Sequence, residues 1–74
     1  MKVEWVDGFK IEAVVEKDGI VISANRAGML SLARQLTALA DGVPGDHIHY
    51  DAYNSLEEGS ADMIIELMPV DAIS

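Results

Sequence analysis

Apolar and polar residues alternate along the first third of the chain. The apolar positions recur every second residue, which is the period of strands that bury one face. This pattern predicts three strands, over residues 3–5, 9–16 and 20–24. Their apolar positions are Val3, Trp5, Phe9, Ile11, Ala13, Val15, Ile20 and Ile22.

The loop over residues 6–8 decides how the first two strands pair. A three-residue loop with a left-handed glycine aligns Trp5 with Phe9 and therefore places both apolar sets on one face. The same alignment pairs Val3 with Ile11. A two-residue turn would put Trp5 on the wrong face, so the longer loop is expected.

The second turn, Asp18-Gly19, is typical of a two-residue type I′ hairpin. It predicts that Val15 pairs with Ile22 and that Ala13 pairs with Ala24. The apolar residues of the third strand then join the same face as those of the first two strands, while the opposite face is largely polar.

From residue 26 the apolar period lengthens to that of an amphipathic helix, which is predicted over residues 26–40. Asn25 is a suitable N-cap, and Gly42 lies where a left-handed residue often ends a helix. Pro44 prevents the helix from continuing. The face expected to meet the sheet consists of Met29, Leu32, Ala33, Leu36, Leu39 and Ala40.

Two further strands are predicted over residues 46–52 and 62–68, joined by a polar loop. The order β-β-β-α-β-β indicates an α+β fold, with one helix packed on one face of a mostly antiparallel sheet. A chain of 74 residues is expected to form a single domain, residues 1–74. Its core should contain Trp5, Phe9, Ile11, Ile22, Leu32, Leu36, Ile48 and Ile65.

Composition narrows the class of protein. Hydrophobic residues make up 50% of the chain, which is too many for a disordered protein. Because the chain has no cysteine, disulfides and thiolate metal clusters are excluded. No apolar run approaches the ~20 residues of a membrane span and no signal peptide opens the chain, so a cytoplasmic location is expected.

Charge is distributed unevenly, since the net charge of −8 lies entirely in residues 38–74, called here the acidic half. An acidic surface repels nucleic acid and membranes and attracts basic proteins. Greater solubility is the alternative explanation of the same charge. The anions of the acidic half are Asp41, Asp46, Asp51, Glu57, Glu58, Asp62, Glu66 and Asp71.

His47, His49 and Asp51 alternate on one predicted strand, so they project from the same face about 6.5–7 Å apart. Two imidazoles and a carboxylate could bind a transition metal. A solvent-exposed strand face explains the pattern more simply, with Ile48 and Tyr50 toward the core. No metal or other cofactor is therefore expected.

His49 and Glu66 lie on neighbouring predicted strands, where such a pair could transfer protons. No cysteine nucleophile accompanies them, and a domain of this size rarely forms a ligand pocket. An enzyme is therefore not expected.

Longer motifs extend over about two-thirds of the chain. Ile22-Ser23-Ala24-Asn25-Arg26-Ala27-Gly28 leads into the helix, and His47-Ile48-His49-Tyr50-Asp51 follows it. Tyr53-Asn54-Ser55-Leu56-Glu57 and Gly59-Ser60-Ala61 come next, before Ile64-Ile65-Glu66. Together these motifs resemble a family of small bacterial immunity proteins from polymorphic toxin systems, immunity protein family thirty-two.

The resemblance implies a non-enzymatic antidote that binds a cognate toxin in the cytoplasm and blocks it. The acidic half suits a basic toxin, such as a nuclease with a basic substrate cleft. The main alternative is a stand-alone acidic domain or homodimer without a toxin partner, and a metal-binding domain is the minor one. The residues expected to bind the partner are His47, His49, Asp51, Tyr53, Glu57, Glu58 and Glu66.

Overall fold

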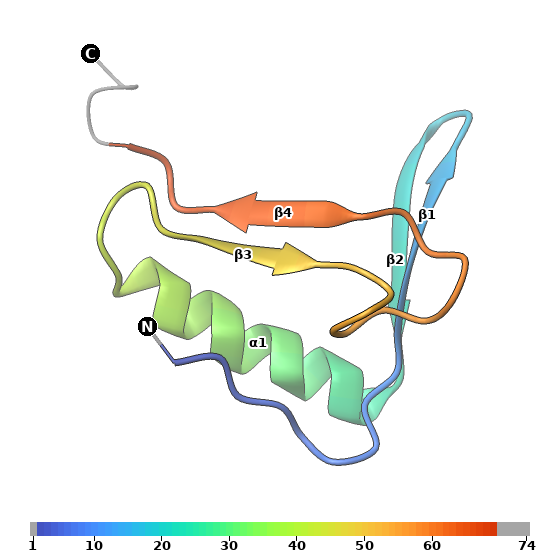
Figure 1. Ribbon diagram of the computed structural model, residues 1–74, viewed down its shortest axis with the longest axis horizontal. Helices are drawn as coiled ribbons and strands as arrows, with labels where there is room; N and C mark the ends of the chain where they lie inside the picture. The colour runs from blue at the N-terminus through green and yellow to red at the C-terminus, as the bar shows by residue number, and fades with distance from the viewer. Residues whose placement is uncertain (1, 70–74) are drawn as a thin grey trace.

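The computed structural model describes residues 2–69 as an α+β fold, with one helix and two small antiparallel sheets. Figure 1 shows the first pair of strands standing across one end of the molecule, while the helix runs alongside the second pair. The elements in chain order are β1 (Ile11–Glu16), β2 (Gly19–Ala24), α1 (Arg26–Ala40), β3 (His47–Tyr50) and β4 (Met63–Glu66).

The first predicted strand does not form, since residues 2–10 contain no strand and the observed order is β-β-α-β-β. Side chains of α1 bind the backbone of this segment instead. Gln35 Nε2 donates to the Glu4 carbonyl at 2.7 Å, and the Val6 N–H donates to Ser31 Oγ at 2.8 Å. Because these groups are satisfied by the helix, the segment needs no partner strand.

The loop after this segment has the predicted glycine conformation. Gly8 is left-handed, with a φ of 82°. Trp5 stacks on Phe9 with ring centroids 4.4 Å apart, although the strand pairing predicted for these two residues does not form. The predicted pairing of Val3 with Ile11 is wrong, because residues 2–10 form no strand and the free edge of β1 at Ile11 is bonded to Glu57 instead.

The β1–β2 hairpin forms, but its register differs from the prediction by two residues. The turn is Lys17-Asp18, flanked by the pair Glu16 and Gly19, rather than Asp18-Gly19. A shift of two residues keeps each side chain on its predicted face. That face is buried only at Ile11 and Ala13, whereas Val15 and Ile20 are exposed, so its predicted burial is wrong toward the turn. The observed pairs include Ile11 with Ala24, Ala13 with Ile22, and Val15 with Ile20.

β3 and β4 form a separate sheet rather than extending the first one. The loop between them occupies the free edge of β1, so the second sheet cannot be joined there. The Glu57 N–H donates to the Ile11 carbonyl and the Ala61 N–H donates to the Ala13 carbonyl, both at 2.8 Å. Both strands are also shorter than predicted.

The helix begins and ends as predicted. Asn25 is the N-cap, and its Oδ1 accepts from the Gly28 N–H at 2.8 Å. Gly42 is not left-handed, which corrects the prediction for the C-terminal end. A glycine is required at position 42 for a steric reason instead, because a Cβ there would lie 2.7 Å from Asp46 Oδ2. That carboxylate accepts from the Val43 N–H at 2.9 Å and closes the following turn.

Only Leu39 and, in part, Leu32 of the predicted apolar face of α1 meet the core. Leu36 is 42% exposed, whereas Gln35 is only 1% exposed. The buried positions are Gly28, Ser31, Gln35 and Leu39. Ser31 and Gln35 point inward because they bind the N-terminal segment. The predicted positions that are exposed instead are Met29, Ala33, Leu36 and Ala40.

The core lies between α1, β1, β3 and the loop that follows β3. Its buried apolar members are Ile11, Ala13, Leu39, Ile48, Tyr50 and Leu56. Of the other predicted core residues, Trp5, Phe9, Leu32 and Ile65 are partly buried and pack against this cluster. Ile22 and Leu36 are exposed, so their predicted burial is wrong.

Candidate functional site

The outer face of β3 and β4 carries three of the residues predicted to bind a partner. The register pairs His47 with Glu66 and His49 with Ile64. All four side chains are exposed, because the alternate residues of each strand turn toward the core. These four residues are called the β3–β4 face. It offers two imidazoles and one carboxylate around an apolar side chain.

His49 and Glu66, considered from sequence as a proton-transfer pair, are not directly opposite one another. His49 faces Ile64, and its ring packs edge-on against that of His47, with centroids 4.8 Å apart. His47 Nδ1 lies 3.1 Å from the Gly45 carbonyl oxygen. The arrangement provides exposed hydrogen-bonding groups rather than an enclosed acid–base pair.

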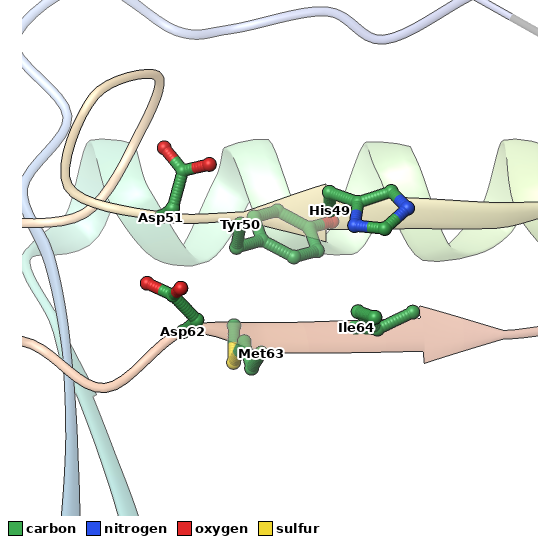
Figure 2. Close-up of a pocket in the computed structure, with 6 residues that line it drawn as sticks. All are labelled: His49, Tyr50, Asp51, Asp62, Met63 and Ile64. Atoms are coloured by element: carbon green, nitrogen blue, oxygen red, sulfur yellow. The ribbon is translucent and has the colours of Figure 1, made fainter.

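Asp51 organises the turn after β3 rather than extending the β3–β4 face. Its Oδ1 accepts from the N–H groups of Tyr53 at 2.9 Å and Asn54 at 3.0 Å. Asn54 Oδ1 accepts in return from the Asp51 N–H at 3.2 Å. In Figure 2 the imidazole of His49 points along β3, away from Asp51. The described part of the chain brings no three His, Cys, Asp or Glu side chains together around a metal position.

Stoichiometric zinc or nickel is expected to leave the melting temperature unchanged. His47, His49 and Asp51 do not converge, and an ion that fails to bind the native state does not stabilise it. Thermal unfolding followed by circular dichroism, with and without metal, measures the effect. A rise of several degrees that disappears in His49→Ala would contradict this expectation and favour a metal-binding domain.

Tyr53 is the most accessible aromatic side chain in the described residues, at 100% exposure. Its backbone is nevertheless held in place. Asp51 binds the Tyr53 N–H, and the Asp51 carbonyl accepts from Ser55 at 3.0 Å and Leu56 at 2.8 Å. Leu56 is buried and anchors the turn to the core. A solvated ring on a fixed turn loses little backbone entropy when a partner covers it.

Glu57 and Glu58 form a second group, beside β1. The Glu57 N–H is bonded to the Ile11 carbonyl, which places this turn against the first hairpin. Glu57 also lines a shallow depression together with Lys10 and Glu12. The predicted partner-binding residues are therefore divided between the β3–β4 face, the turn over residues 51–56, called here the Tyr53 turn, and the edge of β1.

A shallow hollow of about 290 Å³ lies where β3 ends and β4 begins. Figure 2 shows Asp51 and Asp62 at the same end of the strand pair. Asp62 and Ile64 were not among the predicted site residues. The predicted burial of Ile65 implies by alternation that Ile64 faces outward, but an apolar side chain gave no signal of a role in binding. The hollow is lined by His49, Tyr50, Asp51, Asp62, Met63 and Ile64.

Asn25 and Gly28, which belong to the first motif of the resemblance, have structural roles. Asn25 Oδ1 also accepts from the Lys10 N–H at 3.0 Å, and its Nδ2 donates to the Gly8 carbonyl at 2.9 Å. Gly28 lies against the Lys10 carbonyl and β1. The motif therefore fastens the helix to the loop before β1 instead of forming a binding surface.

Comparison with known proteins identifies the family to which this chain belongs. No helix within residues 2–69 has the length and apolar character needed to cross a membrane. Searches of curated proteins and of solved structures found no match. A family model described as Immunity protein 32 matches residues 19–68, a stretch that includes α1, the β3–β4 face and the Tyr53 turn. The chain therefore belongs to the Immunity protein 32 family.

Proposed function

We propose that this chain binds a cognate toxin domain in the bacterial cytoplasm and neutralises it as a stoichiometric, non-enzymatic inhibitor. Membership of the Immunity protein 32 family, over residues 19–68, is the observation that carries the proposal. The exposed hydrogen-bonding groups of the β3–β4 face support a binding role, since they lie on an open surface.

The proposed contact surface combines the β3–β4 face with Tyr53. Accessible aromatic rings are typical of the residues that dominate interface energies, and polar groups commonly surround them. Tyr53 supplies the ring, and His47, His49 and Glu66 supply polar contacts. Asp51 acts as a positioning residue, because it holds the Tyr53 backbone through its carboxylate.

The acidic half favours a basic toxin. Glu57, Glu58, Asp62 and Glu66 are all exposed, so their charges act on an approaching partner through solvent. A surface with charges of a single sign raises the association rate with an oppositely charged protein more than it raises the binding affinity. A nuclease domain with a basic substrate cleft is a toxin of this kind.

The association rate with the toxin domain encoded beside this gene is expected to fall steeply with salt. The Debye length shrinks from about 8 Å at physiological ionic strength to about 3 Å at 1 M, which screens exposed carboxylates. Replacing Glu57 and Glu58 by Gln should slow association about 3–10-fold with little change in dissociation. Stopped-flow binding at several salt concentrations measures both rates.

Tyr53→Ala is expected to act on dissociation instead, raising its rate about 10–100-fold, because a central aromatic contact is lost. The matched charge control is Glu4→Gln with Asp7→Asn, which removes two carboxylates from the N-terminal segment and should change neither rate. Salt-independent association, or an equal effect in the control, would show that the charge serves solubility. Absence of binding and of protection from the toxin would contradict the proposed function itself.

A further inference from the structure

The outer edge of β2 makes no backbone hydrogen bonds to other described residues. On the far side of the hairpin, loop residues bind the carbonyls of Ile11 and Ala13. In an antiparallel pair, two residues opposite one another direct their backbone N–H and C=O groups either both toward each other or both away. Ala24 pairs with Ile11 and Ile22 pairs with Ala13, so Ala24 and Ile22 point these groups away from β1. Ile20 lies two residues from Ile22 and does the same.

β2 also lacks the features that usually protect an edge strand. Its sequence over Gly19–Ala24 has no charged residue and no proline. Ile20 is 69% exposed and Ile22 is 41% exposed on one face, while Val21 is 43% exposed on the other. Long apolar edges pair readily with other strands, and a lone two-stranded hairpin is only marginally stable in water. The edge therefore has the properties of an interface.

We propose that β2 pairs antiparallel with β2 of a second copy of this chain, across a two-fold axis at Ile22. The two hairpins then form one four-stranded sheet. Ile22 of one copy lies opposite Ile22 of the other, and Ile20 lies opposite Ala24 on each side of the axis. Each of these pairs exchanges two backbone hydrogen bonds, so all of the outward-directed groups of the strand are used.

The charges that flank β2 are complementary in this register. Asp18, in the hairpin turn, and Arg26, the first residue of α1, lie just beyond the two ends of β2 at equal sequence distances from the axis, so the pairing brings each Asp18 toward the Arg26 end of the other copy. Within one chain the two residues stand at opposite ends of β2. Residues 1–37 carry no net charge, so two hairpins approach without the repulsion that the acidic half would cause. A neutral hairpin likewise offers no charge attraction to a basic toxin, which makes a second copy the better occupant.

Sedimentation equilibrium of the full chain tests the dimer directly, and a dimer is expected at about 100 μM. Ile22→Lys places two lysines opposite each other at the axis and should weaken association at least ~100-fold. Val15→Lys is the matched control, because Val15 is exposed on the same face but lies on β1, one strand from the edge. It should remain dimeric, and circular dichroism checks that both variants fold.

A charge exchange tests the register. Asp18→Arg or Arg26→Asp alone places like charges opposite one another and should weaken the dimer roughly tenfold. The double variant Asp18→Arg with Arg26→Asp should restore the original affinity. Such rescue requires the two residues to meet between copies, since they are separated by β2 within each chain.

Amide hydrogen exchange supplies a third readout. Exchange at Ile20, Ile22 and Ala24 should slow as protein concentration rises, whereas Val21 and Ser23, which are bonded to β1, should be protected at every concentration. A wild-type chain that remains monomeric at about 1 mM would overturn the proposal. A dimer that Ile22→Lys leaves intact, or pairing of β2 with the toxin alone, would overturn it as well. None of these outcomes depends on whether the toxin binds the β3–β4 face.

Discussion

Replacing Gln35 by Ala is expected to lower the free energy of unfolding by about 3 kcal/mol. The Gln35 side chain is 1% exposed, and it joins two parts of the fold. Its Nε2 donates to the Glu4 carbonyl and its Oε1 accepts from the Tyr50 hydroxyl, both at 2.7 Å. Truncation leaves the buried Tyr50 hydroxyl unsatisfied, which costs about 1–3 kcal/mol, and removes the part-buried bond to the Glu4 carbonyl, which contributes about 1 kcal/mol more.

Leu36→Ala is the matched control, because it removes a larger apolar side chain from the next position of the same helix. Leu36 is 42% exposed, so its loss should cost less than about 1 kcal/mol. Urea unfolding followed by circular dichroism gives both values. A greater loss in Leu36→Ala than in Gln35→Ala would mean that the apolar face predicted from sequence is the buried one after all.

Gln35→Met and Tyr50→Phe extend the test without leaving a large cavity. Because the two side chains share a hydrogen bond, their effects on unfolding should not be additive in a double-mutant cycle. Burial raises the pKa of the Tyr50 hydroxyl above its ordinary value of 10.0, so the group remains a donor in the native state. The unfolded chain loses its proton first as pH rises through 10, and native stability should therefore decline there. Tyr50→Phe should remove that part of the decline.

Gly28→Ala is expected to destabilise the protein by about 2–3 kcal/mol, although Ala is the better helix former. A Cβ at this position would lie 2.5 Å from the Lys10 carbonyl oxygen and 2.9 Å from the Ala24 Cβ. The carbonyl is backbone and accepts from the Asn25 N–H at 3.1 Å, so it cannot move freely. The gain in helix propensity is about 1 kcal/mol, whereas forcing an atom into a packed junction costs about 1–3 kcal/mol or more.

Gly45→Ala separates a crowding effect from a conformational one. Gly45 has a φ of 98°, but a Cβ there would meet nothing within 4 Å. Its replacement should cost only about 1 kcal/mol, from the backbone conformation. Urea unfolding of the two variants compares them directly. If Gly28→Ala proved more stable than the parent, the close approach of α1 to the Lys10 carbonyl would be incorrect.

Features that depend on neighbouring residues were predictable. The bounds of α1, its Asn25 cap, the left-handed Gly8 and the existence of the β1–β2 hairpin all follow from hydrogen bonds or backbone angles within a few positions. Even the hairpin register was wrong only by two residues, because either choice keeps the same side chains on the same face.

Part of the candidate site was predictable for the same reason. Strict alternation over residues 47–50 placed His47 and His49 outward, and the structure shows that Glu66, also predicted from sequence, pairs with His47. Asp51 continues the alternation in sequence, but its carboxylate binds the N–H groups of the next turn. Ile64 and Asp62 were missed because the hollow they line forms only when the end of β3 meets the start of β4.

The sequence by itself determined five of the six predicted elements with their approximate limits, the acidic half and the motifs of the Immunity protein 32 family. Only the tertiary structure decided which face of α1 is buried. Hydrophobic periodicity predicted that Leu36 would face the core, but the backbone of residues 2–10 has no partner strand and needs hydrogen bonds. Ser31 and Gln35 supply those bonds, so the helix turns a polar stripe inward and leaves Leu36 exposed. Hydrogen bonding to the backbone of a segment distant in sequence decided the orientation of the helix against its apolar periodicity. Sequence patterns within the helix cannot predict such a contact.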